Sequence, residues 1–394
     1  TIFMPIVASF FALGLLLGIG GGVLMSVAKG SGNESLAHKY FSTAMISAAD
    51  VSVCFAVFGA IFFDPMMYAL GADTTNIELV RGYGLCYTVS APLFIFSSSL
   101  QSFIRNDKSP RHAMIAVLTG SGLNILLDYL FIFVFKMGMF GASFATSIGT
   151  SITVCILIIH FFTKKNTMRF SFRSFSIKAL WEIAKCGFSS FLIECANAVL
   201  VFVFNHTLLK YIGSVGVTVY SIMSNVAVVC MSLFNGVTLA AQPIIATNHG
   251  ADNHKRVLQV RHIGTITSSV IAVIIFCVGF FFPDLLIYSY VKGPTPEILE
   301  LARYALRIYF FAYLFMNFNI FFSGYFQSTL RPVAAITIQI LRSLLLSSVL
   351  VSVLPMIFGA DAIWYAVPIT ECITFFVAMA FLFFGRFQKT KEAK

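Results

Sequence analysis

The chain has 394 residues, of which 58% are hydrophobic and only 11% are charged, and its mean hydropathy is +0.90. Soluble domains carry about a quarter charged residues, so this composition excludes a water-soluble globular protein. Its apolar segments are long and continuous rather than alternating over about ten residues, which predicts membrane-spanning α-helices and excludes a β-barrel.

Eleven segments are long and apolar enough to cross a hydrocarbon core of ~30 Å as helices. They cover roughly residues 2–28, 42–62, 78–104, 112–136, 138–163, 187–210, 214–247, 257–282, 298–328, 333–357 and 360–386. The predicted fold class is therefore an all-α polytopic membrane protein.

Most of the 26 Lys and Arg residues gather at one set of helix ends, which indicates the orientation in the membrane. That set comprises Lys29, Lys39, Arg105, Lys108, Arg111, Lys164, Lys165, Arg169, Arg173, Lys178, Lys185, Lys255, Arg256, Arg261, Arg331, Arg386, Lys389, Lys391 and Lys394. These ends are predicted to be cytoplasmic, with the C-terminus on that side of the plasma (inner) membrane. The net charge of +10 then matches the anionic inner leaflet, and no nucleic-acid partner is expected.

Weak internal repetition predicts two parallel halves. Gly18 and Gly32 recur 218 residues later as Gly236 and Gly250, "FGA" at 140–142 recurs at 358–360, and Arg81 and Pro110 recur 222 residues later as Arg303 and Pro332. Two pseudo-symmetric helix bundles related in this way are typical of transporters with a site between the halves.

The repeat sets the predicted domain boundaries. An N-terminal lobe of five spans covers 1–163, a basic linker covers 164–186, a C-terminal lobe of six spans covers 187–386, and a tail covers 387–394. The linker is expected to end in an interfacial helix that carries Leu180, Trp181 and Ile183. Because the first half has one span fewer and the orientation puts Thr1 outside, a further helix is expected upstream of this sequence.

The stretch "GLNILLDYLFIFVF" at 122–135 is apolar except for Asn124 and Asp128. Thr146 on the next span lies at the same predicted depth as Asp128, ~12 Å below the turn that joins the two spans. Asn124 is four residues before Asp128, so it shares the face of Asp128 one turn deeper. A carboxylate, an amide oxygen and a hydroxyl would then converge, and oxygen ligands suit Na⁺ or a proton held on the carboxylate. The alternative is a buried Asp that hydrogen-bonds a neighbouring hydroxyl and stabilises helix packing, although carboxylates at membrane depth are usually functional.

Several longer motifs resemble one transporter family. They are "GLNILLDYLFIF" followed by "GMFGASFAT", "AAQPIIATNHGA" at 240–251, "FQSTLRP" at 326–332 and "AIWYAVPITE" at 362–371. In order and spacing the chain resembles the multidrug and toxic-compound extrusion (MATE) family, in the branch of the DinF-type and staphylococcal multidrug exporters. The resemblance implies twelve helices in two six-helix lobes, so that this chain lacks the first, and it implies a cation-binding role for Asn124, Asp128 and Thr146. It also implies a further acidic group of this site on the first helix.

Four more residues are candidates for substrate binding or gating. Glu194 lies on the first helix of the second half, and some branches of the family place a functional acid one turn later, where this chain has Asn197. Arg342 and Glu371 lie near mid-depth on adjacent spans, where a buried ion pair is the structural alternative to a gate.

The sequence offers little for other kinds of chemistry. "GIGGG" at 18–22 lacks the strand and the glycine spacing of a dinucleotide site, so it predicts close helix packing. The sequence has no Walker motif, clustered histidines or CxxC pair, so neither ATP hydrolysis, an enzyme activity nor a cofactor other than the coupling ion is expected.

These observations predict a secondary active transporter that exports small organic, cationic and amphipathic compounds in exchange for H⁺ or Na⁺. Asp128 would bind the ion, the two lobes would alternate between inward-open and outward-open states, and the protein would act as a monomer among membrane lipids. The alternatives are a lipid-linked precursor flippase, which would line its cavity with basic residues, or an inactive truncated transporter.

Overall fold

The computed structural model describes residues 3–74 and 77–392, and all the regular elements in this part are helical. Nine of the described helices are long and apolar enough to span a membrane, and two bent helix pairs bring the total to eleven. The predicted all-α polytopic class and the approximate positions of the eleven spans are therefore confirmed. The chain divides into two compact units, residues 1–195 with 246–252, and residues 196–245 with 253–394.

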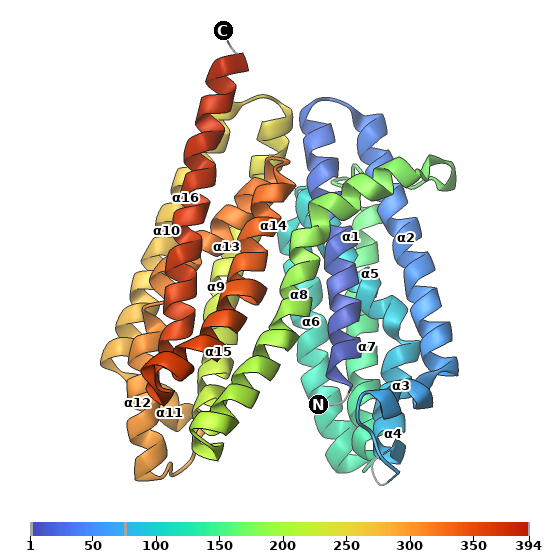
Figure 1. The fold of residues 1–394 in the computed structure, drawn as a ribbon. Helices are drawn as coiled ribbons and strands as arrows, with labels where there is room; N and C mark the ends of the chain where they lie inside the picture. Colours follow the sequence, from blue (N-terminus) through green and yellow to red (C-terminus); the bar gives the residue numbers. More distant parts are fainter. Residues whose placement is uncertain (1–2, 75–76, 393–394) are drawn as a thin grey trace. The chain divides into compact units, whose positions relative to one another are not determined.

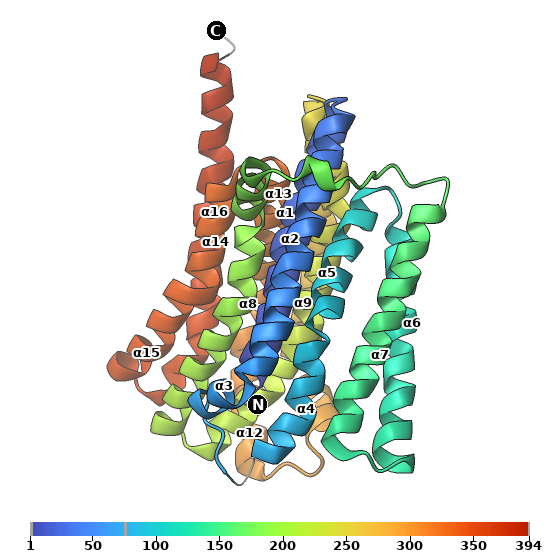
Figure 2. The same cartoon turned by 90° about the vertical axis from the view of Figure 1, so that its right-hand side faces the viewer.

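The first unit is a bundle in which α1 packs against α2 and α5, while α7 packs against α4, α5 and α6 (Figures 1 and 2). Its helices are α1 (Met4–Gly30), α2 (Glu34–Ile61), α3 (Phe63–Ala69), α4 (Ile77–Val89), α5 (Ala91–Asn106), α6 (Pro110–Asp128), α7 (Gly138–Ile159) and the first part of α8 (Ile177–Tyr211). The α4–α5 pair is one span bent by 48°. The bend falls at Ser90, just before Pro92, whose ring suits the first turn of a new helix.

The second unit is a bundle around α13, which packs against α10, α14 and α16. Its helices are the rest of α8, α9 (Ser214–Gly250) as far as Ile245, α10 (His254–Phe281), α11 (Pro283–Tyr290), α12 (Pro296–Phe310), α13 (Tyr313–Ser328), α14 (Pro332–Ile340), α15 (Leu346–Phe358) and α16 (Ala366–Glu392). Phe310, Tyr313 and Trp364 are fully buried in its core. The α12–α13 pair is again one span, bent by 46°.

Local structures recur in the two units at the spacing of the repeat. Asn33 and Asn253 both cap a helix by accepting a hydrogen bond from the backbone N–H three residues later. Each following span leads into a short helix whose acidic residue pairs with an arginine of the next span: Asp64 with Arg81, and Asp284 with Arg303. The sequence repeat therefore corresponds to a repeated three-dimensional unit.

The "GIGGG" segment of α1 serves close packing, as predicted. A Cβ at Gly20 would lie 2.3 Å from the carbonyl oxygen of Ile183, and one at Gly187 would lie 2.0 Å from that of Leu16. Only glycine permits this approach of two helix backbones. The contact packs the first part of α8 against α1.

The contact between Gly187 and α1 explains why the structure differs from the predicted boundary between the linker and the C-terminal lobe at residue 187. The expected interfacial helix is not separate, because α8 runs without a break from Ile177 to Tyr211. Gly187 lies inside this helix and serves packing instead of ending it. The first part of α8 therefore belongs to the first unit by its contacts, which extend to Cys195.

A buried polar cluster fixes the segment between α7 and α8 to the first unit. Asp107, directly after α5, is 2% exposed and accepts hydrogen bonds from Lys29 Nζ (2.5 Å) and from the backbone N–H of Thr167 (3.0 Å), and His160 Nε2 lies 2.9 Å from it. Burial raises the pKa of the Asp107 carboxyl, but the hydrogen bonds from Lys29, Thr167 and His160 outweigh this effect and hold the pKa below its usual range.

We expect Asp107→Asn to lower the free energy of unfolding by about 2 kcal/mol at neutral pH, because charge-assisted hydrogen bonds to a buried carboxylate are lost. The pKa is lower in the folded state, so this stabilisation is present above the unfolded value of about 4 and is lost as the pH falls through the folded value. Thermal unfolding of the detergent-solubilised wild type and variant at pH 7, and again at a pH below the lowered pKa of Asp107, measures the stabilisation and its loss. Asp252→Asn, at an exposed acid, is the control, and an equal loss in both variants would contradict the prediction.

Candidate functional site

The candidate cation site is built on the α6–α7 pair, whose backbones approach closely at two glycines. A Cβ at Gly120 would lie 1.9 Å from Thr153 Oγ1 and 2.6 Å from the carbonyl oxygen of Gly149. A Cβ at Gly149 would lie 2.9 Å from the Cβ of Asn124. The absence of side chains at these positions brings the polar residues of the two helices within reach of each other, and Figure 2 shows α6 and α7 side by side.

The structure brings Asn124 and Thr146 into contact. Asn124 Nδ2 donates a hydrogen bond to Thr146 Oγ1 (3.3 Å), and Thr146 Oγ1 donates to the carbonyl oxygen of Ala142 (3.0 Å). Both residues are half-buried. The sequence predicted that Thr146 lies level with Asp128, but the hydrogen bond of Thr146 goes to Asn124, one turn deeper on α6. The role of these residues in cation binding stays a prediction.

Asp128 lies one turn from Asn124, at the last residue of α6. Its Oδ1 atom is shielded from solvent and has no hydrogen-bond partner among the described residues. A buried carboxylate oxygen without a partner is costly, so such an atom indicates a place for a cation, a proton or a water molecule. Together with the amide and hydroxyl oxygens of Asn124 and Thr146, the donor set is chemically suited to a hard cation such as Na⁺.

Two tyrosines beside Asp128 were not identified from the sequence. The charge of Asp128 acts on the hydroxyl groups of Tyr83 and Tyr87, which follow each other by one turn on α4. Cys86, between them, contacts Ser147 of α7 through their side chains (3.8 Å), so α4 forms a third wall of the site. The sequence contained one indication of them: Tyr83 and Tyr87 are four residues apart on the predicted span 78–104, a spacing that places both on one face of a helix.

Helix α6 changes its geometry directly after Asp128. Residues Tyr129–Val134 form a π-helix, a rare conformation that is frequent at functional sites. The irregular segment follows the one intramembrane carboxylate of this span.

The second unit holds the predicted pair of Arg342 and Glu371 as a buried ion pair. Arg342 donates to Glu371 Oε1 through Nε (3.0 Å) and Nη2 (2.8 Å), and Asn319 Nδ2 donates to Glu371 Oε2 (2.7 Å). Both side chains are less than 10% exposed. The structure therefore shows the buried ion pair, which was the structural alternative to a gate, and a gating role stays a prediction.

The remaining candidates lie on α8. Glu194 is half-buried and has no hydrogen bond or ion pair to another described residue, while Asn197 is exposed. The two compact units divide between these two positions, so they belong to different units. The described residues include no group of three or more His, Cys, Asp or Glu side chains that could hold a metal ion.

Comparison with known proteins decides the family. The family model MatE matches residues 1–130 and 186–353. The chain belongs to the MatE family. It is 26% identical over 378 residues to the multidrug export protein MepA of Staphylococcus haemolyticus (strain JCSC1435), covering 95% of this chain and 82% of that protein. It is 27% identical over 392 residues to MepA of Staphylococcus saprophyticus subsp. saprophyticus, covering 99% and 86%.

Solved structures of MATE transporters share the fold. An outward-facing multidrug resistance MATE family transporter of the MOP superfamily superposes with a TM-score of 0.91 at 20% identity, covering 99% of this chain and 87% of that one. A MOP superfamily transporter from Pyrococcus furiosus Vc1 superposes with a TM-score of 0.90 at 20% identity, covering 100% and 88%. The MatE chain described here is thus a multi-pass membrane protein of a transporter family, in the staphylococcal multidrug-exporter branch that its motifs resemble.

We expect Gly120→Ala to destabilise the protein by about 1–3 kcal/mol, because the added methyl group must push α6 away from α7. Gly122→Ala is a matched control, since a Cβ at Gly122 meets nothing within 4 Å and alanine favours the helix. Thermal unfolding in detergent compares the two variants. Equal stability of Gly120→Ala and Gly122→Ala would show that the two helices are not held as closely as the structure indicates.

We expect Arg342→Met to destabilise the second unit by about 3 kcal/mol, because it leaves the Glu371 carboxylate buried without its cation. Arg342→Met combined with Glu371→Met should restore most of this loss, since it removes the uncompensated charge as well. Unfolding midpoints of the wild type, both single variants and the double variant form the cycle. A double variant less stable than either single variant would mean that the ion pair itself is required for the fold.

Proposed function

We propose that this protein is a secondary active exporter of small organic, cationic and amphipathic compounds, driven by entry of H⁺ or Na⁺. The observation that carries the proposal is the solvent-shielded Oδ1 atom of Asp128, which has no hydrogen-bond partner among the described residues and lies near the hydrogen-bonded pair of Asn124 and Thr146. The names of its relatives, multidrug export proteins, support the substrate class. The protein would act as a monomer in the plasma membrane with its C-terminus in the cytoplasm.

In this mechanism Asp128 binds the coupling ion. A carboxylate in an apolar environment gains stability when it takes up a proton or a metal cation, because the net charge left in the membrane is then smaller. Asn124 and Thr146 contribute neutral oxygen atoms, and the hydroxyl groups of Tyr83 and Tyr87 lie within reach of the changing charge. Ion binding would change the local charge by one unit and so bias the equilibrium between inward-open and outward-open states.

The residues outside this cluster take supporting roles. Glu194 and Asn197 on α8 are proposed to contact a cationic substrate, since Glu194 has no hydrogen bond or ion pair to another described residue. Arg342 and Glu371 are proposed as a fixed pair that holds the π-helical segment Leu341–Leu345, which follows α14, against α16.

A lipid-linked precursor flippase, the alternative function, would line its cavity with basic residues. Arg342 is a basic residue inside a span and was the candidate for this role. Its guanidinium is bonded to Glu371, so it does not present a free positive charge to an anionic substrate. This pairing favours the exporter over the flippase.

We expect Asp128→Asn to reduce gradient-driven efflux at least tenfold, because asparagine cannot take up a proton or balance a cation. The measurement is efflux of a fluorescent cationic dye from proteoliposomes under an imposed pH gradient or Na⁺ gradient. The gradient that drives the wild type identifies the ion.

The control for this experiment is Asp50→Asn, which removes an exposed carboxylate from α2 of the same unit. It should transport like the wild type, and thermal unfolding should show that both variants are folded. Undiminished efflux in Asp128→Asn would remove this residue from the coupling mechanism. Absence of efflux in the wild type under either gradient, with a response to lipid-linked substrates, would favour the flippase.

A further inference from the structure

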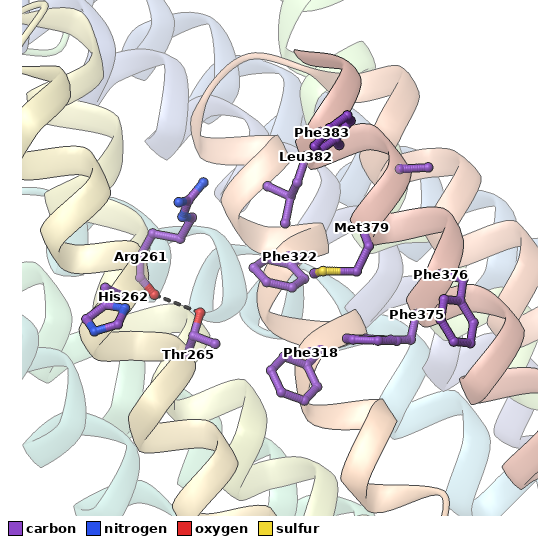
Figure 3. Close-up of a pocket in the computed structure, with 11 residues that line it drawn as sticks. Arg261, His262, Thr265, Phe318, Phe322, Phe375, Phe376, Met379, Leu382 and Phe383 are labelled. Atoms are coloured by element: carbon purple, nitrogen blue, oxygen red, sulfur yellow. Dashed lines mark hydrogen bonds between the residues drawn. The ribbon is translucent and has the colours of Figure 1, made fainter. Parts of the chain in front are cut away.

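A groove of about 770 Å³ lies in the second unit between α10 and α16. Helix α13 packs against both of these helices and forms the floor of the groove. Figure 3 shows Arg261 and Thr265 of α10 facing Phe318 and Phe322 of α13, with Phe375 and Met379 of α16 on the other side. The transport mechanism proposed above does not use this groove.

The walls of the groove carry exposed apolar side chains. Ile263 is 63% exposed on α10, and Phe376, which lines the groove, is 64% exposed on α16. Both helices qualify as membrane spans, and exposed apolar side chains on such helices are typical of a surface that contacts hydrocarbon. An apolar chain is the occupant that suits these walls.

The length of the groove corresponds to one leaflet of the bilayer. It extends along α16 from Phe375 to Phe383, which lies three residues before the basic Arg386 in the sequence. Eight residues of helix rise ~12 Å, and half of a ~30 Å hydrocarbon core is ~15 Å. The groove therefore reaches from the membrane surface to near the midplane.

A positive charge lies at the surface end of the groove. Arg261 is seven residues from the start of α10, and its guanidinium lies over the ring of Tyr325, 5.7 Å from the centroid. No acidic side chain of the described part of the chain forms an ion pair with Arg261, and none lines the groove. Lys255 and Arg256 precede it on the same helix but do not line the groove, so Arg261 is the lining residue whose fixed charge can contact an anionic headgroup.

We propose that this groove binds an anionic phospholipid, with one acyl chain against Phe318, Phe322 and Met379 and the headgroup phosphate at Arg261. Guanidinium groups bind phosphate oxygens in a bidentate manner, and they do so well where the surroundings are partly apolar. The aromatic walls provide the apolar surface that the acyl chain needs. The bound lipid would belong to the leaflet on the basic side of the membrane.

The test measures lipid binding to the purified, delipidated protein in detergent and does not depend on transport. Phosphatidylglycerol and phosphatidylcholine with the same acyl chains are titrated, and bound lipid is counted by native mass spectrometry together with the shift in thermal unfolding. Wild-type protein should bind phosphatidylglycerol in preference to phosphatidylcholine. Arg261→Gln should need about tenfold more phosphatidylglycerol for half-maximal binding, which corresponds to the loss of one phosphate contact. It should no longer prefer phosphatidylglycerol to phosphatidylcholine.

Matched variants separate the headgroup from the chain. Arg256→Gln removes an exposed charge from the same helix outside the groove and should bind like the wild type. Ala380→Phe fills the groove and should weaken binding of both lipids, whereas Ile373→Phe enlarges an exposed residue of α16 outside it and should not.

Three results would overturn the proposal. The first is an unchanged headgroup preference in Arg261→Gln, or the same loss in Arg256→Gln. The second is unchanged lipid binding in folded Ala380→Phe. The third is stabilisation by glycerol 3-phosphate alone as strong as that by the lipid, because it would show that the apolar groove contributes nothing.

Discussion

A carboxylate inside a membrane needs a partner, and the two units satisfy this requirement in different ways. In the second unit both oxygens of Glu371 are occupied, one by Arg342 and the other by Asn319, so the group is neutralised by the protein itself. In the first unit Asp128 leaves Oδ1 without a partner among the described residues. The first arrangement is complete and stabilises packing, whereas the second would gain free energy from a bound ion. This difference is the reason for proposing ion coupling in the first unit.

The two units repeat the same arrangement of helices, but they do not repeat the polar groups inside the membrane spans. The helix caps at Asn33 and Asn253 and the ion pairs of Asp64 and Asp284 with their arginines recur at equivalent places near the ends of spans. Groups at these ends contact water or headgroups, so their requirements are the same in both units. Inside the hydrocarbon each polar group is costly and persists only where it has a function or a partner. The two units are therefore similar at the helix ends and differ in the membrane interior.

The sequence predicted the spans and the repeat, and it predicted that Asn124, Asp128 and Thr146 lie close together, because each follows from hydropathy, spacing or helical rise. It placed Thr146 level with Asp128, whereas Thr146 bonds Asn124 one turn deeper. It did not predict that Tyr83 and Tyr87 lie near enough to Asp128 to feel its charge, since that depends on how α4 packs against α7 and not on either segment alone. The boundary at 187 was misplaced for a related reason. A glycine next to a basic amphipathic segment is typical of a break, but here Gly187 admits the backbone of α1 and the helix continues.

The π-helical segments that directly follow α6 and α14 also limit what can be predicted from the sequence. Each unit has a π-helical segment beside a charged residue: Tyr129–Val134 follows Asp128, and Leu341–Leu345 contains Arg342. A π-helix adds a residue to one turn and so rotates the following part of the helix by ~100° relative to a regular pattern. Periodicity analysis assumes a constant rotation per residue, so it cannot assign the face of a side chain beyond such a segment. The same rotation lets a span direct its charged residue inward while the turns beyond it keep apolar side chains toward lipid.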